Sequence, residues 1–293
     1  MKQRYVSRQA WAFLTPATFY VAAFSLCPMI VAAWLSLHDW HLLQDSRPFV
    51  GLANYRAAFA DPFFRNALFN SIVFTVFSVP LGVALALAAA VLANQRLRGI
   101  AVFRTLFYIP SVTSGVAMAM VWLWVFMPNQ GLINQCLRWC GGSGDTDFLG
   151  DTRWAMAALI VMSAVMGLGP RMVIFLAGLQ SVPENLCEAA EVDGCNAWQR
   201  FRHVTLPTLA PTTFFVFVTS TISALQMFTP VYIMTQGGPR RTTDVVAYHI
   251  YQEAWHRLNI GMASAQSYVL LAATLLMATI QFTFMRRQES VLE

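Results

Sequence analysis

Six long stretches with few or no charged residues divide the 293-residue chain. A transmembrane helix needs roughly 20 mainly apolar residues in a row, and each stretch is long enough to span a bilayer. Only 11% of the residues are charged and the mean hydropathy is +0.53, whereas about 25% are charged in a typical soluble domain. The sequence therefore predicts an all-α, polytopic membrane protein with six transmembrane helices. The predicted spans are Trp11–Leu37, Ala67–Ala93, Thr105–Met127, Trp154–Leu179, Thr208–Ile233 and Ile260–Met285.

Basic residues next to the spans predict the orientation, because Lys and Arg are enriched in cytoplasmic segments. These residues are Lys2, Arg4, Arg8, Arg96, Arg98, Arg104, Arg286 and Arg287. We expect a cytoplasmic tail at 1–10, a membrane domain at 11–285 and a second cytoplasmic tail at 286–293. An even number of spans also places the connection between the fourth and fifth spans, residues 181–207, in the cytoplasm. The three outer loops hold eight Arg and eight acidic residues, so the net charge of +5 lies on the inner side and indicates membrane orientation rather than nucleic-acid binding.

A polar segment, Glu184–Pro211, stands between the fourth and fifth apolar stretches. Ser181 followed by Glu184 three residues later is typical of a capping box, and Pro183 suits the first turn of a helix. Gly194 tolerates the left-handed conformation that closes many helices. The sequence therefore predicts a helix from about Pro183 to Gly194.

A second helix is predicted directly after this glycine. Asn196 and Gln199 form another potential capping pair, and Pro207 cannot continue a helix interior. The polar segment is thus predicted to consist of two helices joined by a hinge at Gly194. Ala189 and Ala190 are small enough to let another backbone approach closely. The polar segment is either a docking surface for a soluble partner or a solvated amphipathic connector.

Motifs for catalysis or nucleotide binding are not found in the sequence. There is no GxxxxGK[S/T] phosphate loop, no Rossmann glycine pattern and no HExxH motif, so an ATPase, if one is used, must be another polypeptide. Cys136 and Cys140 are predicted to lie outside, where they form either a disulfide or one face of a helix, and no His joins them in a zinc pattern. We predict no catalytic residue and no metal site.

Small residues and prolines predict how the spans pack and bend. The Ala- and Gly-rich part of the second span, Pro80–Ala93, favours close helix packing. Prolines kink or break membrane helices where other groups satisfy the freed backbone. The prolines concerned are Pro16, Pro28, Pro80, Pro110 and Pro230.

A few polar and aromatic residues inside the spans are candidates for a substrate path. Arg171, near the inner end of the fourth span, either lines a path or extends to the lipid headgroups. Gln226, Phe228 and Tyr232 offer the hydrogen-bonding groups and aromatic faces that a sugar requires, and Asn70 is a further polar candidate. For each of the polar residues, hydrogen bonding between helices is the alternative.

Four segments extend these observations into a resemblance that covers nearly the whole chain. Within the polar segment, Glu188-Ala189-Ala190 is followed by Gly194 and then by Val204-Thr205-Leu206-Pro207, in the order and spacing of the cytoplasmic EAA loop of ABC-importer permeases. The chain resembles the carbohydrate-uptake branch of that family, in which the Thr-x-Gly-Gly-Pro stretch is typical. The resembling segments are VGLANYRAAFADPFFRNALFNS (Val50–Ser71), LRGIAVFRTLFYIP (Leu97–Pro110), IFLAGLQSVPENLCEAAEVDGCNAWQRFRHVTLP (Ile174–Pro207) and YIMTQGGPRRTTDVVAYHIYQEAW (Tyr232–Trp255).

The resemblance implies roles for residues of the polar segment. The positions that match the coupling helix, which docks on the ATPase, are Glu188, Ala189, Ala190, Asp193 and Gly194, with Leu206 and Pro207 closing the motif. Where the family often has an aromatic and a polar residue, this chain has Pro170-Arg171. A cation there favours an anionic or modified sugar, or it is a neutral substitution.

The resemblance also implies the partners. A second permease subunit, two cytoplasmic ABC ATPase subunits and an extracytoplasmic solute-binding protein would complete a sugar importer in a prokaryotic inner membrane. No cofactor is expected on this chain, because ATP and Mg²⁺ would bind to the ATPase. Three alternatives are an ABC permease for a non-sugar solute, a stand-alone secondary transporter, which often shows an inverted repeat and midplane charge pairs, and a membrane-embedded enzyme.

Overall fold

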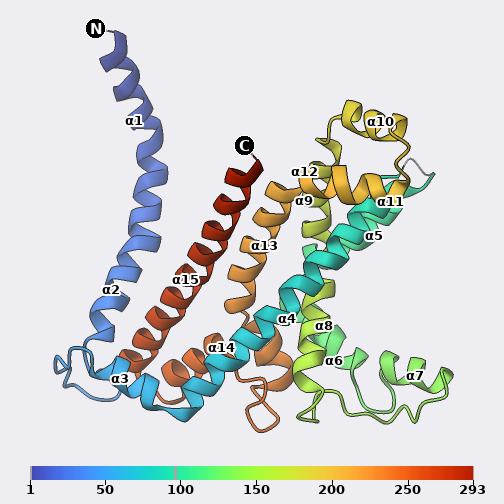
Figure 1. The fold of residues 1–293 in the computed structure, drawn as a ribbon. Helices are drawn as coiled ribbons and strands as arrows, with labels where there is room; N and C mark the ends of the chain where they lie inside the picture. The colour runs from blue at the N-terminus through green and yellow to red at the C-terminus, as the bar shows by residue number, and fades with distance from the viewer. Residues whose placement is uncertain (1, 96–97, 293) are drawn as a thin grey trace. The chain divides into compact units, whose positions relative to one another are not determined.

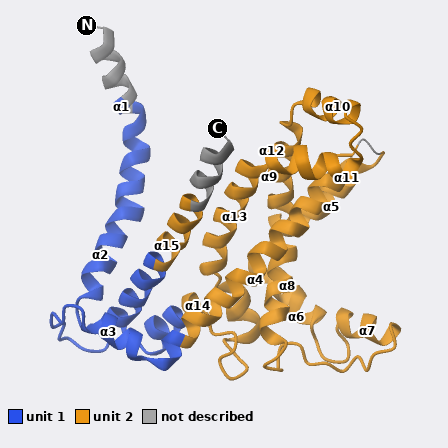
Figure 2. Cartoon of the chain, viewed as in Figure 1, with its two compact units in different colours: residues 1–65, 249–272 blue, residues 66–248, 273–293 orange. Residues whose placement is uncertain are grey.

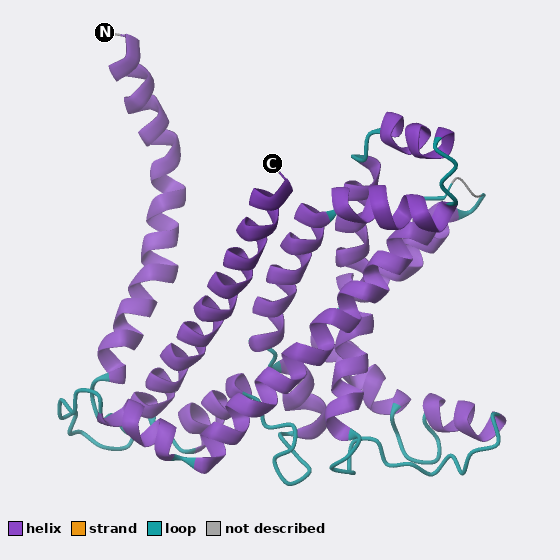
Figure 3. Ribbon diagram, in the orientation of Figure 1, coloured by secondary structure: helices purple, strands orange, loops and turns teal. Residues whose placement is uncertain are grey.

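The computed structural model describes residues 2–95 and 98–292 (Figure 1). Within these residues every regular element is a helix, and β structure is confined to the isolated bridges His38↔Phe49 and His41↔Asn259 (Figure 3). Helices satisfy all their backbone hydrogen bonds internally, which a hydrocarbon environment demands. The prediction of an all-α protein is confirmed. Arg96, one of the basic residues that predict the orientation, lies outside the described residues.

The chain divides into two compact units (Figure 2). Unit 1 comprises residues 1–65 and 249–272, and unit 2 comprises residues 66–248 and 273–293. Three elements contribute to both units, namely the long helices α4 (Pro62–Ala93) and α15 (Ile260–Leu292) and the short helix α14 (Val246–Tyr251). The other elements of unit 1 are α1 (Lys2–Val21), the π-helical turn η1 (Ala22–Leu26), α2 (Cys27–Ser36), α3 (Ala53–Ala60) and the π-helical turn η4 (Gln252–His256).

Unit 1 is held together by polar contacts at the ends of its helices. The buried Asn54 of α3 donates from its side-chain amide to the carbonyl oxygens of Ser36 and His38, at 2.9 and 3.0 Å. The Tyr268 hydroxyl on α15 donates to the Met29 carbonyl at 2.6 Å. The Asn54 contacts satisfy carbonyl groups at the end of α2, which a helix end leaves unpaired. The Tyr268 contact ties α15 to the first turn of α2.

Most of the apolar span Phe13–Ser36 of unit 1 is exposed. No part of its most apolar window is buried, and Phe13 is 86% exposed. A surface this apolar requires lipid or another polypeptide around it.

Unit 2 contains the remaining elements. They are α5 (Ile100–Val112), α6 (Gly115–Val125), α7 (Leu132–Trp139), α8 (Ala155–Met166), α9 (Leu168–Gln180), α10 (Glu184–Val192), α11 (Ala197–Arg200), η2 (Phe201–Thr205), α12 (Leu206–Thr208), α13 (Ala210–Leu225) and η3 (Val231–Thr235). Figure 2 shows α10 and α11 at one end of this unit and α7 at the opposite end.

Small residues allow the helices of unit 2 to approach closely. Ala86, Ala90 and Ala93 of α4 are fully buried, which confirms the packing surface predicted from the Ala-rich sequence. A Cβ atom at Gly169 of α9 would lie 2.9 Å from the Tyr108 Cα atom of α5. A Cβ atom at Gly178, further along α9, would lie 2.8 Å from the Thr212 hydroxyl of α13. Helix α9 is therefore packed against α5 and α13 at positions where only glycine fits.

Three helices are long and apolar enough to cross a membrane by themselves, namely Phe13–Ser36, Pro62–Ala93 and Ile260–Thr283. Three further stretches are helix pairs with a sharp bend, of 104° between α5 and α6, 46° between α8 and α9, and 66° between Ala197–Thr208 and α13. Counting each pair as one span gives up to six. Of the kinks or breaks expected at prolines, no break forms at Pro16, Pro80 or Pro110, because α1, α4 and α5 continue through these residues.

Candidate functional site

The polar segment begins with α10, which closes on the predicted glycine. The helix ends at Val192, and Gly194 adopts a φ of +80°. The Cys195 N–H donates to the Ala190 carbonyl at 2.9 Å and the Gly194 N–H to the Glu191 carbonyl at 3.0 Å. This pattern is a Schellman motif, in which a left-handed residue satisfies the last carbonyls of a helix. The prediction that the first helix ends at Gly194 is confirmed.

The predicted capping box at the start of this helix is wrong. Pro183 is the N-cap residue, and no side-chain cap hydrogen bond is formed. The Ser181 hydroxyl instead donates to the Gly178 carbonyl at 2.8 Å, because Ser181 is the C-cap of the preceding helix α9. A hydroxyl that back-bonds into one helix cannot cap the next one.

The second capping box forms as predicted. The Gln199 N–H donates to the Asn196 side chain at 2.8 Å, and the Asn196 N–H donates to the Gln199 side chain at 2.9 Å. Beyond α11 the chain makes the π-helical turn η2, in which the Leu206 N–H donates to the Phe201 carbonyl. The extra residue of this turn adapts the helix to Pro207, which has no N–H and crowds the preceding turn.

The two faces of α10 differ in exposure. Glu188 and Ala189 are exposed, whereas Ala190 is 7% exposed. Helix α10 packs against α11 and η2. Asp193, Gly194, Leu206 and Pro207, the other predicted coupling residues, are all exposed. The segment therefore leaves Glu188 and Ala189 exposed on a short helix that packs against its neighbour.

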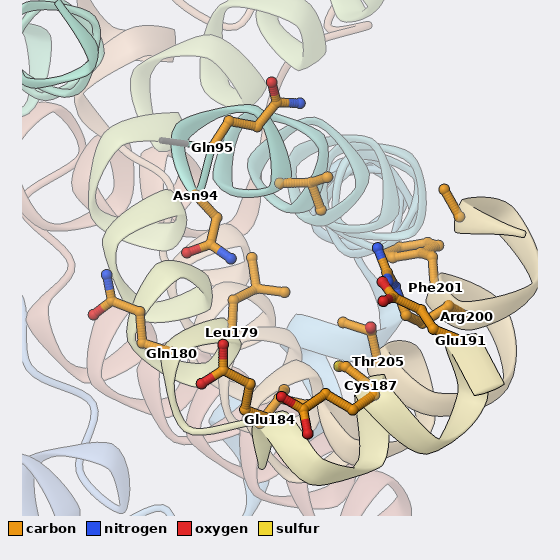
Figure 4. Close-up of a pocket in the computed structure, with 14 residues that line it drawn as sticks. Asn94, Gln95, Leu179, Gln180, Glu184, Cys187, Glu191, Arg200, Phe201 and Thr205 are labelled. Atoms are coloured by element: carbon orange, nitrogen blue, oxygen red, sulfur yellow. The ribbon is translucent and has the colours of Figure 1, made fainter. Parts of the chain in front are cut away.

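A cavity of about 860 Å³ lies between this segment and the ends of α4 and α9. Its wall carries Glu184, Glu188 and Glu191, together with Asn94 from the end of α4. In Figure 4 Glu191 and Arg200 lie against each other on one side, while Asn94 and Glu184 point towards the opening. Glu191 and Arg200 form an ion pair between α10 and α11. This pair joins the two helices across the glycine hinge.

Arg171 lies between helices of unit 2. It belongs to the second turn of α9, just beyond the 46° bend between α8 and α9. A Cβ atom at Gly167, in that bend, would lie 2.7 Å from the guanidinium carbon, and Gly82 of α4 is also in contact with the guanidinium group. The buried Nη1 atom has no hydrogen-bond partner within residues 2–95 and 98–292. The guanidinium is thus half-buried in the interior of the unit.

Asn70 has a structural role in this conformation. Its side chain is 7% exposed, and its amide nitrogen donates to the carbonyl oxygens of Arg241 and Asp244, each at 2.9 Å. Both donor sites are therefore used by the loop that follows the Thr-x-Gly-Gly-Pro stretch.

Two of the predicted path residues are in contact with each other. The rings of Phe228 and Tyr232 are stacked with centroids 5.3 Å apart, and the ring of Tyr248 lies 6.4 and 6.5 Å from them. Tyr232 is 39% exposed, so the cluster presents aromatic surface. Gln226 is exposed at the end of α13.

Sequence reasoning missed three residues that contribute to these sites. Tyr248 is 5% exposed and joins the aromatic cluster from α14, and no local pattern distinguishes it from its neighbours. Asn94 and Gln95 line the cavity below α10. The sequence could have indicated these two residues, because two amide side chains directly follow the Ala-rich run of α4.

Comparison with known proteins places the chain in a family. Residues 58–290 match the family described as binding-protein-dependent transport system inner membrane component. The sn-glycerol-3-phosphate transport system permease protein UgpA of Agrobacterium fabrum is 33% identical over 279 residues, which cover 95% of this chain and 94% of UgpA. The lactose transport system permease protein LacF of Rhizobium radiobacter is 32% identical over 292 residues, which cover 98% and 97% of the two chains.

The fold is also shared with a solved structure. A chain of a bacterial ABC transporter involved in the import of the acidic polysaccharide alginate superposes with a TM-score of 0.84. The alignment covers 98% of each chain at 23% sequence identity.

Proposed function

Because the chain belongs to the family of inner membrane components of binding-protein-dependent transport systems, we propose that it forms half of the translocation path of an ATP-driven sugar importer. Relatives whose names include lactose and sn-glycerol-3-phosphate transport support a sugar or sugar derivative as the cargo. The observation that carries the coupling role is the geometry of α10. Helix α10 ends at a left-handed Gly194, packs against α11, and leaves both Glu188 and Ala189 exposed.

The partners follow from the family and from the exposed surfaces. An importer of this kind requires two cytoplasmic ATPase subunits, which bind ATP and Mg²⁺, and an extracytoplasmic solute-binding protein. The uncovered apolar span Phe13–Ser36 supports a second permease subunit or lipid as its neighbour. If each bent helix pair forms one span, six spans put both termini and α10 on the same side of the membrane. The basic residues next to the spans support the cytoplasm as that side.

The proposed mechanism is alternating access. Closure of the ATPase subunits on ATP moves the docked α10, and the spans then switch between inward-open and outward-open states. A docked helix can drive this change only if the ATPase binds it differently in the two states. The ion pair between Glu191 and Arg200 transmits the movement, since it joins α10 to α11. The capping box of Asn196 and Gln199 stabilises the start of α11.

Charge reversal at the exposed face of α10 tests this assignment. In Glu188→Lys we expect ATP-dependent uptake to fall by about tenfold or more, because each 1.4 kcal/mol of lost docking free energy weakens binding tenfold. The amount of the chain in the membrane should not change, because Glu188 is exposed. Asp145→Lys, at an exposed carboxylate in an outer loop, is the matched control and should transport normally. Wild-type uptake by Glu188→Lys would refute the coupling role.

The class of sugar is proposed from Arg171. A half-buried guanidinium with an unpaired Nη1 atom favours an anionic group, since buried cations are normally paired. We therefore expect an acidic or phosphorylated sugar. Uptake of sugar phosphates, uronides and neutral sugars by the importer in vesicles, with wild type and Arg171→Gln, measures this preference. A wild type that carries only neutral sugars, or an Arg171→Gln variant with unchanged preference, would reject an anionic cargo.

A further inference from the structure

Three ionisable side chains that the transport function does not use converge in unit 1. Asp61 lies between α3 and α4, and its Oδ1 atom accepts a hydrogen bond from the Phe63 N–H at 2.9 Å. His249 belongs to α14, and Glu253 follows four residues later in η4. A spacing of four residues places two side chains on the same face of a helix. One potential metal-ligand atom from each of the three residues lies within 4.8 Å of the others.

The distances in this cluster leave room for an ion. The Nε2 atom of His249 is 3.8 Å from Asp61 Oδ2 and 3.7 Å from Glu253 Oε1. Both distances exceed those of N–H···O hydrogen bonds, which are about 2.7–3.2 Å. Two ligand atoms about 2.1 Å from one Zn²⁺ ion at the tetrahedral angle lie about 3.4 Å apart. The two distances from His249 are thus close to this value. The ligand atoms of Asp61 and Glu253 lie within 4.8 Å of each other, so binding of one ion by all three residues would draw the two carboxylates together.

The charges and the burial of the cluster also favour a cation. The side chains of His249 and Glu253 are 1% and 5% exposed, and that of Asp61 is 25% exposed. Arg257 forms an ion pair with Glu253. With a neutral imidazole, two carboxylates and one guanidinium leave a net negative charge, which is costly at a buried site unless it is compensated.

The surroundings of the imidazole are apolar on one side. The ring of the fully buried Phe64 lies with its centroid 5.8 Å from that of His249. Such a wall restricts solvent at a metal site and strengthens the electrostatic interaction there. Access remains through the partly exposed Asp61.

We propose that Asp61, His249 and Glu253 bind a divalent transition-metal ion, for which Zn²⁺ is the best match. An imidazole with two carboxylates suits zinc and related first-row ions, whereas Ca²⁺ and Mg²⁺ prefer oxygen ligands alone. Water would complete the coordination at the open side. The ion would fasten the junction of α3 and α4 to the α14–η4 helix, two segments of unit 1 that are far apart in the sequence. In the predicted topology this site faces the outside of the membrane.

An imidazolium is the competing explanation. A protonated His249 between two carboxylates would also neutralise the cluster, and it would require no metal. The two explanations predict opposite responses to a chelator and to added zinc.

The experiment measures zinc binding by the detergent-purified protein with the subunits that co-purify with it. After treatment with a chelator, the protein is titrated with Zn²⁺, bound zinc is quantified by mass spectrometry, and thermal unfolding is followed. Wild type should bind one Zn²⁺ per chain, and its Tm should rise with zinc concentration, because a ligand that binds only the folded state stabilises it.

Asp61→Asn is the decisive variant. Its Oδ1 atom can still accept the Phe63 N–H, so the start of α4 keeps its cap, but the carboxylate ligand is lost. We expect zinc affinity to fall by about tenfold or more, and His249→Gln should have a similar effect. Asp45→Asn, at an exposed residue of the same unit, is the matched control and should bind zinc as wild type does. Absence of zinc binding by wild type, equal binding by Asp61→Asn, or a Tm that depends on pH but not on zinc would overturn the proposal.

Discussion

The backbone conformation of Gly194 allows us to predict how much a substitution there destabilises the polar segment. Its φ is +80°, and a Cβ atom added there would meet no atom within 4 Å. A side chain therefore costs only the left-handed conformation, about 1–2 kcal/mol for an ordinary L-residue. That free energy changes the ratio of closed to frayed loop by about 5–30-fold. The cost has a purely conformational origin, so it should depend on the type of side chain and not on its volume.

The variants Gly194→Val and Gly194→Asn separate conformation from volume. Asparagine tolerates the left-handed region, whereas the β-branched valine does not. If α10 is the docking helix, the apparent affinity for the ATPase falls in proportion to the fraction of competent loop. We expect Gly194→Val to weaken ATPase binding by up to about 30-fold and Gly194→Asn to have little effect.

Titration of the reconstituted permease with purified ATPase, with coupled ATP hydrolysis as the readout, measures these affinities. An equal loss of ATPase affinity in both variants would mean that the volume of the side chain at the interface decides the affinity, rather than the φ angle of residue 194. Unchanged affinity in Gly194→Val would refute the argument that the left-handed closure positions α10.

Three further predictions concern the supports of this segment and the packing of the spans. Glu191→Arg should reduce uptake modestly, because an exposed ion pair contributes only about 0–1 kcal/mol, and adding Arg200→Glu should restore it; no recovery in the double variant would contradict the pairing. Asn196→Ala should lower the stability of α11 by about 1 kcal/mol, seen as faster hydrogen exchange of its amides, while Asn196→Asp should exchange as wild type does. Gly169→Ala should lower the Tm in detergent, since a Cβ atom there overlaps the backbone of α5 and overpacking costs about 1–3 kcal/mol. Gly115→Ala, where an added Cβ meets nothing within 4 Å, is its control, and equal Tm values for the two variants would contradict the close contact.

Local signals predicted the polar segment well. Gly194, Asn196 and Gln199 act on their own neighbours along the chain, so the end of α10 and the cap of α11 could be located from the sequence alone. The error at Ser181 has the same origin, because its hydroxyl had two possible helices to cap and the sequence does not rank them. Hydropathy likewise located the apolar stretches but not their bends. The 46° bend falls at Gly167 rather than at the nearby Pro170.

Contacts between distant segments could not be predicted. Asn70 donates to the carbonyl of Arg241, 171 residues away, and an isolated asparagine in an apolar run gives no indication of this partner. Asp61 and His249 are also far apart in the sequence, and neither belongs to a recognisable metal-binding motif. Sequence patterns report on the faces of single helices, whereas these sites depend on which helices meet.

The position of α9 links the two parts of the proposed site. This helix has 13 residues, carries Arg171 near its start and leads at its end into the polar segment. At Gly178 it packs so closely on α13 that an added Cβ would overlap the Thr212 hydroxyl, so α9 and α13 are held together directly behind α10. A force on α10 is therefore transmitted to both helices, and the bend at Gly167 is the place where α9 can turn relative to α8. Because the guanidinium of Arg171 packs against Gly167, any change in that bend must move the cation. The proposed docking surface at one end of α9 and the charge of Arg171 at the other are thus connected through one helix.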